Sequence, residues 1–343
     1  LGAKANGKRA AFSYLVLSIT GVLGCAFLYY TGNAIFHFEL ENQTMSVVSI
    51  ALVNTIFRLF GVLITLPFLS LIIRLLSKLI KPSALELRSS GELDRLDERF
   101  LATPTLAVEQ SRLTIYAMAK TAQENLQKSI HLIDSYSDEE FKIIESIEEL
   151  IDSYEDKIGT YLVKLTAHEL TKEQNDNVSK FLHTLTDFER IGDHAVNLAE
   201  AAEELHEKNI VFSPNAKNEL KVLFSATQEI LRLSVNCFLK NDIEMAYHVE
   251  PLEDHIDNLC EQIKRRHINR IQNGECNLSQ GFVFNDILSN IERVADHCSN
   301  LAVAEIELEA DEFDTHSFLN AVKEQKTHHF SELYEEYSKR FEI

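Results

Sequence analysis

The sequence predicts an all-α protein in which two membrane-spanning helices precede a helical body built from two similar three-helix bundles. The 343 residues include only 11 Gly and 5 Pro and no Trp, so residues that interrupt helices are scarce. Apolar residues recur at intervals of three and four over long stretches, which is the period of an amphipathic helix. One phrase of eleven residues also occurs twice in the second half of the chain, which indicates one helical unit used twice.

Two long apolar stretches open the chain. Residues 10–31 contain no charge over 22 residues, which is long enough to span the hydrocarbon core of a bilayer. Residues 47–73 form the second stretch, which is interrupted by Asn54, Arg58 and Pro67. Arg58 either marks a functional position that faces protein or water, or extends its charged end to the membrane surface. The sequence therefore predicts two transmembrane helices.

Charge is distributed unevenly along the chain. Residues 1–82, the predicted membrane segment, hold seven Lys or Arg and two acids, whereas the remainder holds 26 basic and 51 acidic residues. Basic residues flank the outer ends of both stretches, and the loop between them carries Glu39 and Glu41 but no Lys or Arg. The positive-inside rule thus predicts a multi-pass protein of the inner (cell) membrane with both ends in the cytoplasm. The acidic body argues against nucleic acid as a partner.

The body divides at its polar breaks and turn residues. A polar linker covers residues 83–103, and Pro214 and the pair Asn273-Gly274 mark later breaks. The predicted domains are 104–209 and 210–310, each a three-helix bundle, followed by a C-terminal segment 311–343. The helices are expected over residues 105–134, 138–166, 172–207, 214–240, 242–272, 279–308 and 315–341.

The repeated phrase places acids and amides along one side of a helix. Seven of its eleven positions are identical between residues 189–199 and 292–302. Glu, Asp and Asn at positions i, i+4 and i+8 lie on one side of an α-helix. The first acid of each copy falls on the apolar stripe, where a carboxylate must be paired, hydrogen-bonded, protonated or metal-bound. The candidate ligands are Glu189, Asp193 and Asn197 in the first copy and Glu292, Asp296 and Asn300 in the second.

A pair of acids four residues apart precedes each phrase. Asp152 and Asp156 form the first pair, and Glu253 and Asp257, 101 residues later, form the second. If the two helices of a unit pack antiparallel, four carboxylates converge, with no Lys or Arg at the i+4 positions. A hard cation such as Mg, Mn, Ca or Fe would relieve their repulsion, since such cations prefer oxygen ligands.

Other interpretations of these residues stay open. The acids could form a structural repeat in which Arg190 and Arg293 make salt bridges with them. His194 and His297, about 100° further round the helix, are expected to support the site or to lie on the surface rather than to bind metal. The five cysteines show no C-x-x-C spacing, which excludes a thiolate zinc site. No nucleophile or Gly-rich phosphate loop is evident, so we expect no enzyme.

The twin Glu-Arg-x-x-Asp-His-x-x-Asn phrases, with the acid pairs ahead of them, resemble PhoU domains over roughly residues 95–310. The resemblance implies two tandem three-helix bundles with metal clusters, and regulation of phosphate transport. The implied cofactors are divalent or trivalent ions (Fe, Mn, Mg or Zn, with the identity open). The implied ligands are Asp152, Asp156, Glu189, Asp193, Glu253, Asp257, Glu292 and Asp296, with Asn197 and Asn300 matching the trailing Asn.

The membrane part resembles the end of a bacterial sodium-dependent phosphate cotransporter of the type II family. Lys8-Arg9-Ala10-Ala11 and Val53–Arg58 carry this resemblance, although Asn54 and Arg58 depart from the family pattern. The implied partners are inorganic phosphate, sodium and the lipid bilayer. The family's core transport repeats, rich in Gln and Ser, are absent, so a longer transporter is expected. The alternative is a membrane-anchored PhoU-like regulator without transport activity. The oligomeric state stays open, a homo-oligomer included.

Overall fold

The computed structural model describes residues 5–37, 46–82, 91–310 and 328–343, and these are helical with no β-strand. The chain divides into two compact units, Leu1–Ser90 and Gly91–Ile343. The predicted all-α fold is confirmed. Some predicted features lie outside the described residues: the acids Glu39 and Glu41, residues 83–90 of the linker and the beginning of the C-terminal helix up to residue 327.

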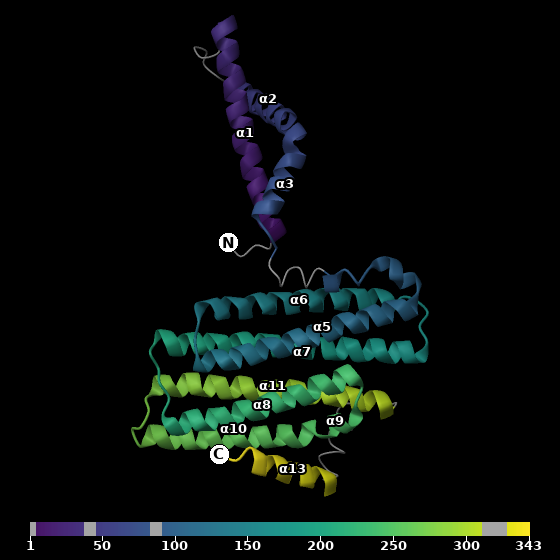
Figure 1. Cartoon of the computed structure of the whole chain (residues 1–343), viewed down its shortest axis with the longest axis vertical. Helices are drawn as coiled ribbons and strands as arrows, with labels where there is room; N and C mark the ends of the chain where they lie inside the picture. Colours follow the sequence, from purple (N-terminus) through teal and green to yellow (C-terminus); the bar gives the residue numbers. More distant parts are fainter. Residues whose placement is uncertain (1–4, 38–45, 83–90, 311–327) are drawn as a thin grey trace. The chain divides into compact units, whose positions relative to one another are not determined.

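The first unit contains two helices that are long and apolar enough to cross a membrane by length and composition. The second of these, Val47–Leu79, is interrupted at Pro67, one of the interrupting residues noted in the sequence. Pro67 has no backbone N–H and cannot continue an α-helix, so a short 3-10 turn interrupts the stretch there. The elements are α1 (Ala5–Phe36), α2 (Val47–Thr65), η2 (Leu66–Phe68) and α3 (Leu69–Leu79) (Figure 1).

Two contacts hold the helices of this unit together. A Cβ atom added at Gly21 of α1 would lie 3.3 Å from the Cα of Gly61 in α2, so glycine lets the two backbones approach closely. Arg9 donates hydrogen bonds to the carbonyl of Ile80 from Nε at 3.0 Å and from Nη2 at 2.7 Å. That carbonyl lies just beyond α3, where the helix itself offers no donor.

The second unit begins with the first three-helix bundle, whose helix bounds follow the prediction closely. Ser137 caps α6, and Thr171 and Gln174 form a capping box at the start of α7. Pro104 stands in the first turn of α5, where its missing N–H costs nothing. The elements are η3 (Glu98–Ala102), α5 (Pro104–Asp134), α6 (Asp138–Leu165) and α7 (Lys172–Glu207).

The second bundle differs from the prediction at one point. The single helix expected over 242–272 is broken after Tyr247, because the ring of Pro251 would collide with that carbonyl in a continuous helix. His248 links the two pieces. The elements are α8 (Pro214–Lys240), α9 (Ile243–Tyr247), α10 (Val249–Gln272) and α11 (Leu278–Ala310).

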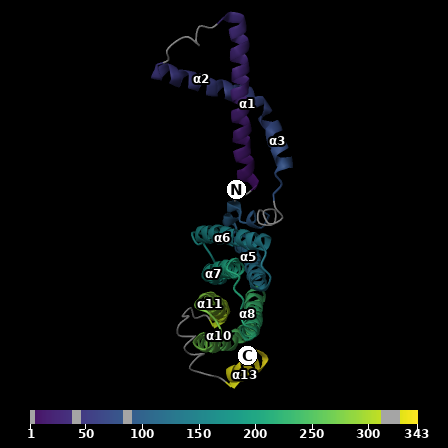
Figure 2. The same cartoon turned by 90° about the vertical axis from the view of Figure 1, so that its left-hand side faces the viewer.

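The two bundles pack on one another within this unit. Helix α7 of the first lies against α11 of the second, and α5 contacts α8 (Figures 1 and 2). Lys180 on α7 and Glu305 on α11 form an ion pair with Nζ and Oε1 3.0 Å apart, and their side chains are only 1% and 2% exposed. This pair ties together residues that are 125 positions apart in the sequence.

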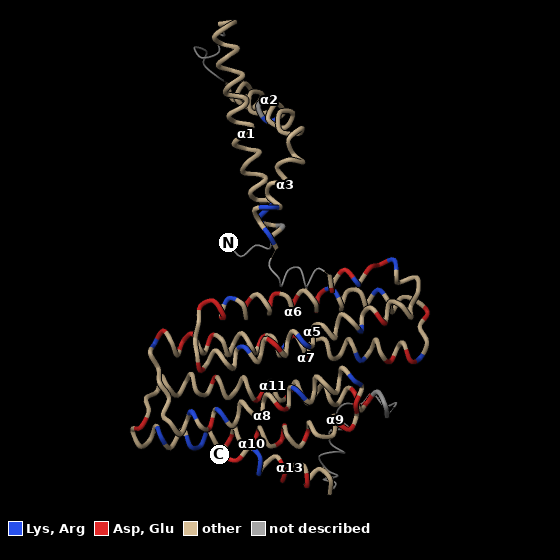
Figure 3. The backbone as a smooth tube through the Cα atoms, in the orientation of Figure 1, with Lys and Arg blue, Asp and Glu red and all other residues tan. Residues whose placement is uncertain are grey.

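The chain ends in α13 (His328–Arg340), which packs against α10. Its Tyr337 hydroxyl lies 3.0 Å from Nδ1 of His248, and Arg340 makes an ion pair of 3.1 Å with Glu229 of α8. Figure 3 shows charged residues spread over the helices of this second unit, whereas the described helices of the first carry few. The second unit is therefore rich in charged residues, and the described helices of the first unit are poor in them.

Candidate metal centres

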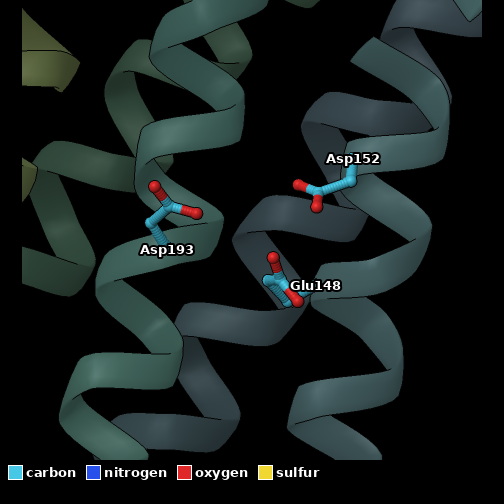
Figure 4. A group of neighbouring side chains, drawn as sticks. All are labelled: Glu148, Asp152 and Asp193. Carbon is cyan, nitrogen blue, oxygen red and sulfur yellow. The ribbon is translucent and has the colours of Figure 1, made fainter. Parts of the chain in front are cut away.

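The first cluster of acids forms where α6 packs against α7. Glu148 and Asp152 are four residues apart on α6, and Asp193 lies on α7. One carboxylate oxygen from each of the three lies within 4.8 Å of the others. Figure 4 shows the three carboxylates directed toward one another from the two helices. We name Glu148, Asp152 and Asp193 the first triad.

The second cluster forms between α10 and α11 in the same manner. Glu253 and Asp257 are four residues apart on α10, and Asp296 lies on α11. Their carboxylate oxygens also lie within 4.8 Å of one another, and Glu253 is only 7% exposed. We name these three residues the second triad. Each bundle thus brings together one i, i+4 pair and one aspartate of the repeated phrase.

The two triads occupy equivalent positions, and they pair the acids of the two bundles differently from the sequence-based alignment. Glu148 matches Glu253 and Asp152 matches Asp257, an offset of 105 residues, with Ile preceding the aspartate in both copies. The sequence-based pairing of Asp152 and Asp156 with the second pair is therefore displaced by one helical turn. Asp156 lies outside the first triad and lines a surface cavity.

The first acids of the repeated phrases lie outside the triads as well. Glu189 is half-buried, and its carboxylate lies 3.4 Å from Nε of Arg190. Burial, and next the charge of Asp193, raise the pKa of Glu189. Glu292 makes an ion pair of 2.6 Å with Lys264 of α10. The sequence did not predict Lys264 as the partner of Glu292, because the two residues lie on different helices.

Arg190 also contacts the first triad, since its Nη1 lies 3.0 Å from Oδ2 of Asp193. The alternative interpretation of the acids, a structural repeat with salt bridges, therefore holds in part for the first copy. Arg190 is exposed and its pair with Asp193 lies at the protein surface, where such pairs contribute little to stability. The carboxylates of Glu148 and Asp152 still lie close to each other beside this ion pair.

Asn197 and Asn300 of the repeated phrases are not part of the triads and instead make hydrogen bonds between the two bundles. Nδ2 of Asn197 donates to Oδ1 of Asn290 at 3.1 Å, and Nδ2 of Asn300 donates to Oδ1 of Asp187 at 3.0 Å. Asp187 and Asn290 are themselves 103 positions apart, the offset of the two phrases. This bridging pair was not predicted from the sequence.

Negative charge is unfavourable at the first triad, because its carboxylates are partly buried and lie close together. Burial raises the pKa of Glu148 to about 7, and the charges of Asp152 and Asp193 add to this effect. Burial also raises the pKa of Asp152, as does the charge of Asp193. Such a group of carboxylates is stabilised by sharing a proton or by a bound cation.

The donor sets fit hard cations on chemical grounds. Both triads offer only carboxylate oxygens, which suit Mg, Mn, Ca or Fe, and neither includes a thiol or an imidazole. The five cysteines are free, and those at positions 237, 260 and 298 are buried, where desolvation raises the pKa of each thiol to about 12. A soft thiolate site is thus not available in the described residues.

The helical body matches the model of the PhoU domain twice, over residues 115–202 and 220–304. The chain belongs to the PhoU domain family. The matched segments coincide with the two bundles, so the predicted resemblance to PhoU domains is confirmed.

Relatives with curated names agree with this assignment. A Thermotoga maritima protein named phosphate-specific transport system accessory protein PhoU homolog 1 is 29% identical over 49% of this chain and 72% of its own length. A Clostridium acetobutylicum protein named as a PhoU homolog is 21% identical over 59% of this chain and 91% of its own. The relatives are named as accessory proteins, and the family assignment bears out the prediction that the chain is not an enzyme.

Two solved structures share the fold. PhoU from Pseudomonas aeruginosa aligns with a TM-score of 0.56 and 22% identity over 62% of this chain and 99% of that one. The phosphate transport system regulatory protein PhoU from Streptococcus pneumoniae aligns with a TM-score of 0.52 and 19% identity, over 60% and 95%. At these identities the likeness establishes the paired three-helix architecture.

Proposed function

We propose that this PhoU-family chain regulates phosphate transport through two metal-binding triads on its helical body. The observation that carries the proposal is that each bundle brings three carboxylates within 4.8 Å at equivalent positions. The names of the relatives, which describe accessory and regulatory proteins of phosphate transport systems, support the phosphate part.

Glu148, Asp152 and Asp193 would hold one ion or cluster, and Glu253, Asp257 and Asp296 the other. A bound divalent or trivalent cation would neutralise the carboxylates and hold α6 against α7 and α10 against α11. The raised pKa of Glu148 supports this assignment, since its proton and a cation would compete for the same carboxylate. Magnesium, manganese, calcium and iron are the candidates that the oxygen ligands favour.

Metal analysis of the full chain tests the assignment. We expect Asp193→Asn together with Asp296→Asn to lower bound metal at least several-fold after dialysis, as measured by inductively coupled plasma mass spectrometry. Asp156→Asn is the matched control, because Asp156 lies on α6 outside the triad. Equal metal content in the double variant and in the wild type would remove the proposed sites.

For the first unit, we propose that α1 and the α2–α3 stretch cross the cell membrane and that the body faces the cytoplasm. The two helices are apolar enough by composition, and most of their large apolar side chains are exposed, as lipid contact requires. The resemblance of residues 1–82 to sodium-dependent phosphate cotransporters supports a role as part of such a transporter. Sodium and inorganic phosphate would then be partners of the complete protein.

The genomic reading frame around the chain decides between the two forms of this proposal. An upstream extension that encodes Gln- and Ser-rich spans, together with sodium-dependent uptake of labelled phosphate by cells that express it, would support the transporter. An unrelated upstream gene, with a separate phosphate transporter copurifying with this chain, would favour the membrane-anchored regulator.

A further inference from the structure

A cavity of about 320 Å³ lies where the two bundles of the second unit are connected. It is lined by the ends of α5 and α7, by the linker between α7 and α8, and by the first turns of α8. Ligand pockets commonly occupy such junctions and begin at about 300 Å³. The cavity has no residue in common with either triad.

The linker that borders the cavity has a defined conformation. Asn209 adopts a left-handed backbone with φ of 51°, and the N–H of Ile210 bonds to the carbonyl of Leu205 at 2.9 Å. These are the features of a Schellman motif, which ends a helix in a fixed direction. Ser213 then caps α8 through a bond of 3.3 Å from the N–H of Ala216. The backbone of this linker thus has a defined conformation where it borders the cavity.

Aromatic side chains line part of the cavity. The rings of Tyr136 and His206 stack with centroids 4.7 Å apart and an interplanar angle of 24°. Phe212 and Phe224 also line the cavity and are largely buried. A planar apolar ring would gain both stacking and burial against these side chains.

Two lysines also line the cavity. Lys217 and Lys221 are one turn apart on α8, are exposed and line the cavity. Among the residues that the structure describes, no acid makes an ion pair with either lysine, whereas nearby Lys208 is paired with Glu204 at 2.6 Å. Asp134 is the one carboxylate among the lining residues. Two unneutralised amines in a chain of net charge −20 make this a local attraction for an anion.

We propose that this cavity binds a nucleoside monophosphate, with the phosphate on Lys217 and Lys221 and the base against the aromatic side chains that line it. Lysine is a common phosphate binder, and two amines one turn apart can contact a single phosphate group. The volume suits one base and one ribose phosphate better than a larger dinucleotide. The proposal is independent of the metal sites, because none of the lining residues belongs to a triad.

Isothermal titration of the full chain in detergent tests the proposal with three probes: AMP, adenosine and inorganic phosphate. We expect AMP to bind, and the other two to bind at least tenfold more weakly because each lacks one half of the recognised group. Lys217→Gln with Lys221→Gln should weaken AMP binding roughly tenfold or more, the usual effect of losing charged hydrogen bonds. Tyr136→Leu should weaken binding of AMP while leaving binding of inorganic phosphate unchanged.

The control is Lys120→Gln with Lys142→Gln, which removes the same charge from exposed positions on α5 and α6 outside the cavity. A second control uses Asp193→Asn with Asp296→Asn, since a phosphate coordinated by a metal at the triads would be lost there. Unchanged AMP affinity in the Lys217 and Lys221 double variant would overturn the proposal. So would equal affinity for inorganic phosphate and AMP, or loss of AMP binding in the triad variant.

Discussion

His194 of α7 and His297 of α11 lie beside each other at the junction of the two bundles, with ring centroids 5.7 Å apart. They occupy the same position of the two repeated phrases, so the bundles meet at equivalent points. Each Nδ1 contacts an oxygen of the opposite bundle: Oδ1 of Asn290 at 2.8 Å for His194, and Oδ1 of Asp187 at 2.9 Å for His297. The sequence-based prediction placed these histidines beside a metal site or on the surface. In the structure they make contacts between the two bundles instead.

The two halves of this junction differ by one functional group, and this difference gives a prediction. Asp187→Asn would leave His297 and Asn300 with an amide in place of the carboxylate that both now contact. We expect the free energy of unfolding to fall by about 1 kcal/mol, since a charged acceptor is replaced by a neutral one. Urea unfolding followed by circular dichroism measures this. Asn290→Asp is the reciprocal variant, and equal losses in both would contradict a role specific to the charge of Asp187.

The buried ion pair of Lys180 and Glu305 gives a larger effect. Lys180→Met leaves Glu305 buried without its cation, and losing one partner of such a pair costs about 3–5 kcal/mol. The double variant Lys180→Met with Glu305→Leu should recover most of this loss, because no uncompensated charge remains. Urea unfolding of the wild type, Lys180→Met, Glu305→Leu and the double variant completes a double-mutant cycle. A double variant as unstable as Lys180→Met alone would show that the lysine acts through packing.

The first triad predicts a pH dependence in the metal-free protein. The folded-state pKa of Glu148, about 7, is above its ordinary value of 4.5, so Glu148 binds its proton more tightly in the folded state. Its favourable contribution is complete below pH 4.5 and is lost as the pH rises toward 7. Urea unfolding in EDTA should show stability falling across this window in the wild type, with a flatter profile in Glu148→Gln. Asp156→Asn is the control, and an identical pH profile in Glu148→Gln and the wild type would contradict the prediction.

Gly192 permits the approach of α6 to α7 beside the first triad. A Cβ atom there would lie 2.9 Å from Cδ1 and 3.3 Å from Cγ2 of Ile151, a fully buried β-branched side chain with little freedom to move. We expect Gly192→Ala to destabilise the protein by about 1 kcal/mol, as overpacking does. Gly159→Ala, whose Cβ would make ordinary contact at 3.5 Å with Leu185, should instead stabilise the helix by up to about 1 kcal/mol. Thermal unfolding that ranks the two variants equally would count against this packing.

The local signals in the sequence predicted the helices of the body well. Capping residues such as Ser137 and Thr171 and the breaks at Pro214 and Gly274 act within a few residues, so their effect can be read without knowledge of the fold. The one break that was missed within the body has a local cause too. Pro251 interrupts an apolar pattern whose periodicity alone suggests a continuous helix.

Which acids of α6 belong to the first triad was harder to predict from the sequence. Glu148, Asp152 and Asp156 follow one another at four-residue intervals, so all three lie on nearly the same side of α6. Spacing within one helix therefore does not select which two face Asp193. The shared Ile-Asp pair at 151–152 and 256–257, each with Glu three residues ahead of Ile, was the available signal for the correct alignment.

The sequence by itself determined the helical class, the duplicated unit, the two apolar stretches and the aspartates Asp193 and Asp296 as members of acidic clusters, because all of these follow from short-range spacing. Tertiary structure alone decided that Glu148 completes the first triad, that Glu292 is paired with Lys264, and that Lys180 meets Glu305. Those contacts depend on how one helix is rotated and shifted against another. That arrangement is set by the packing of whole apolar faces, which no local pattern specifies.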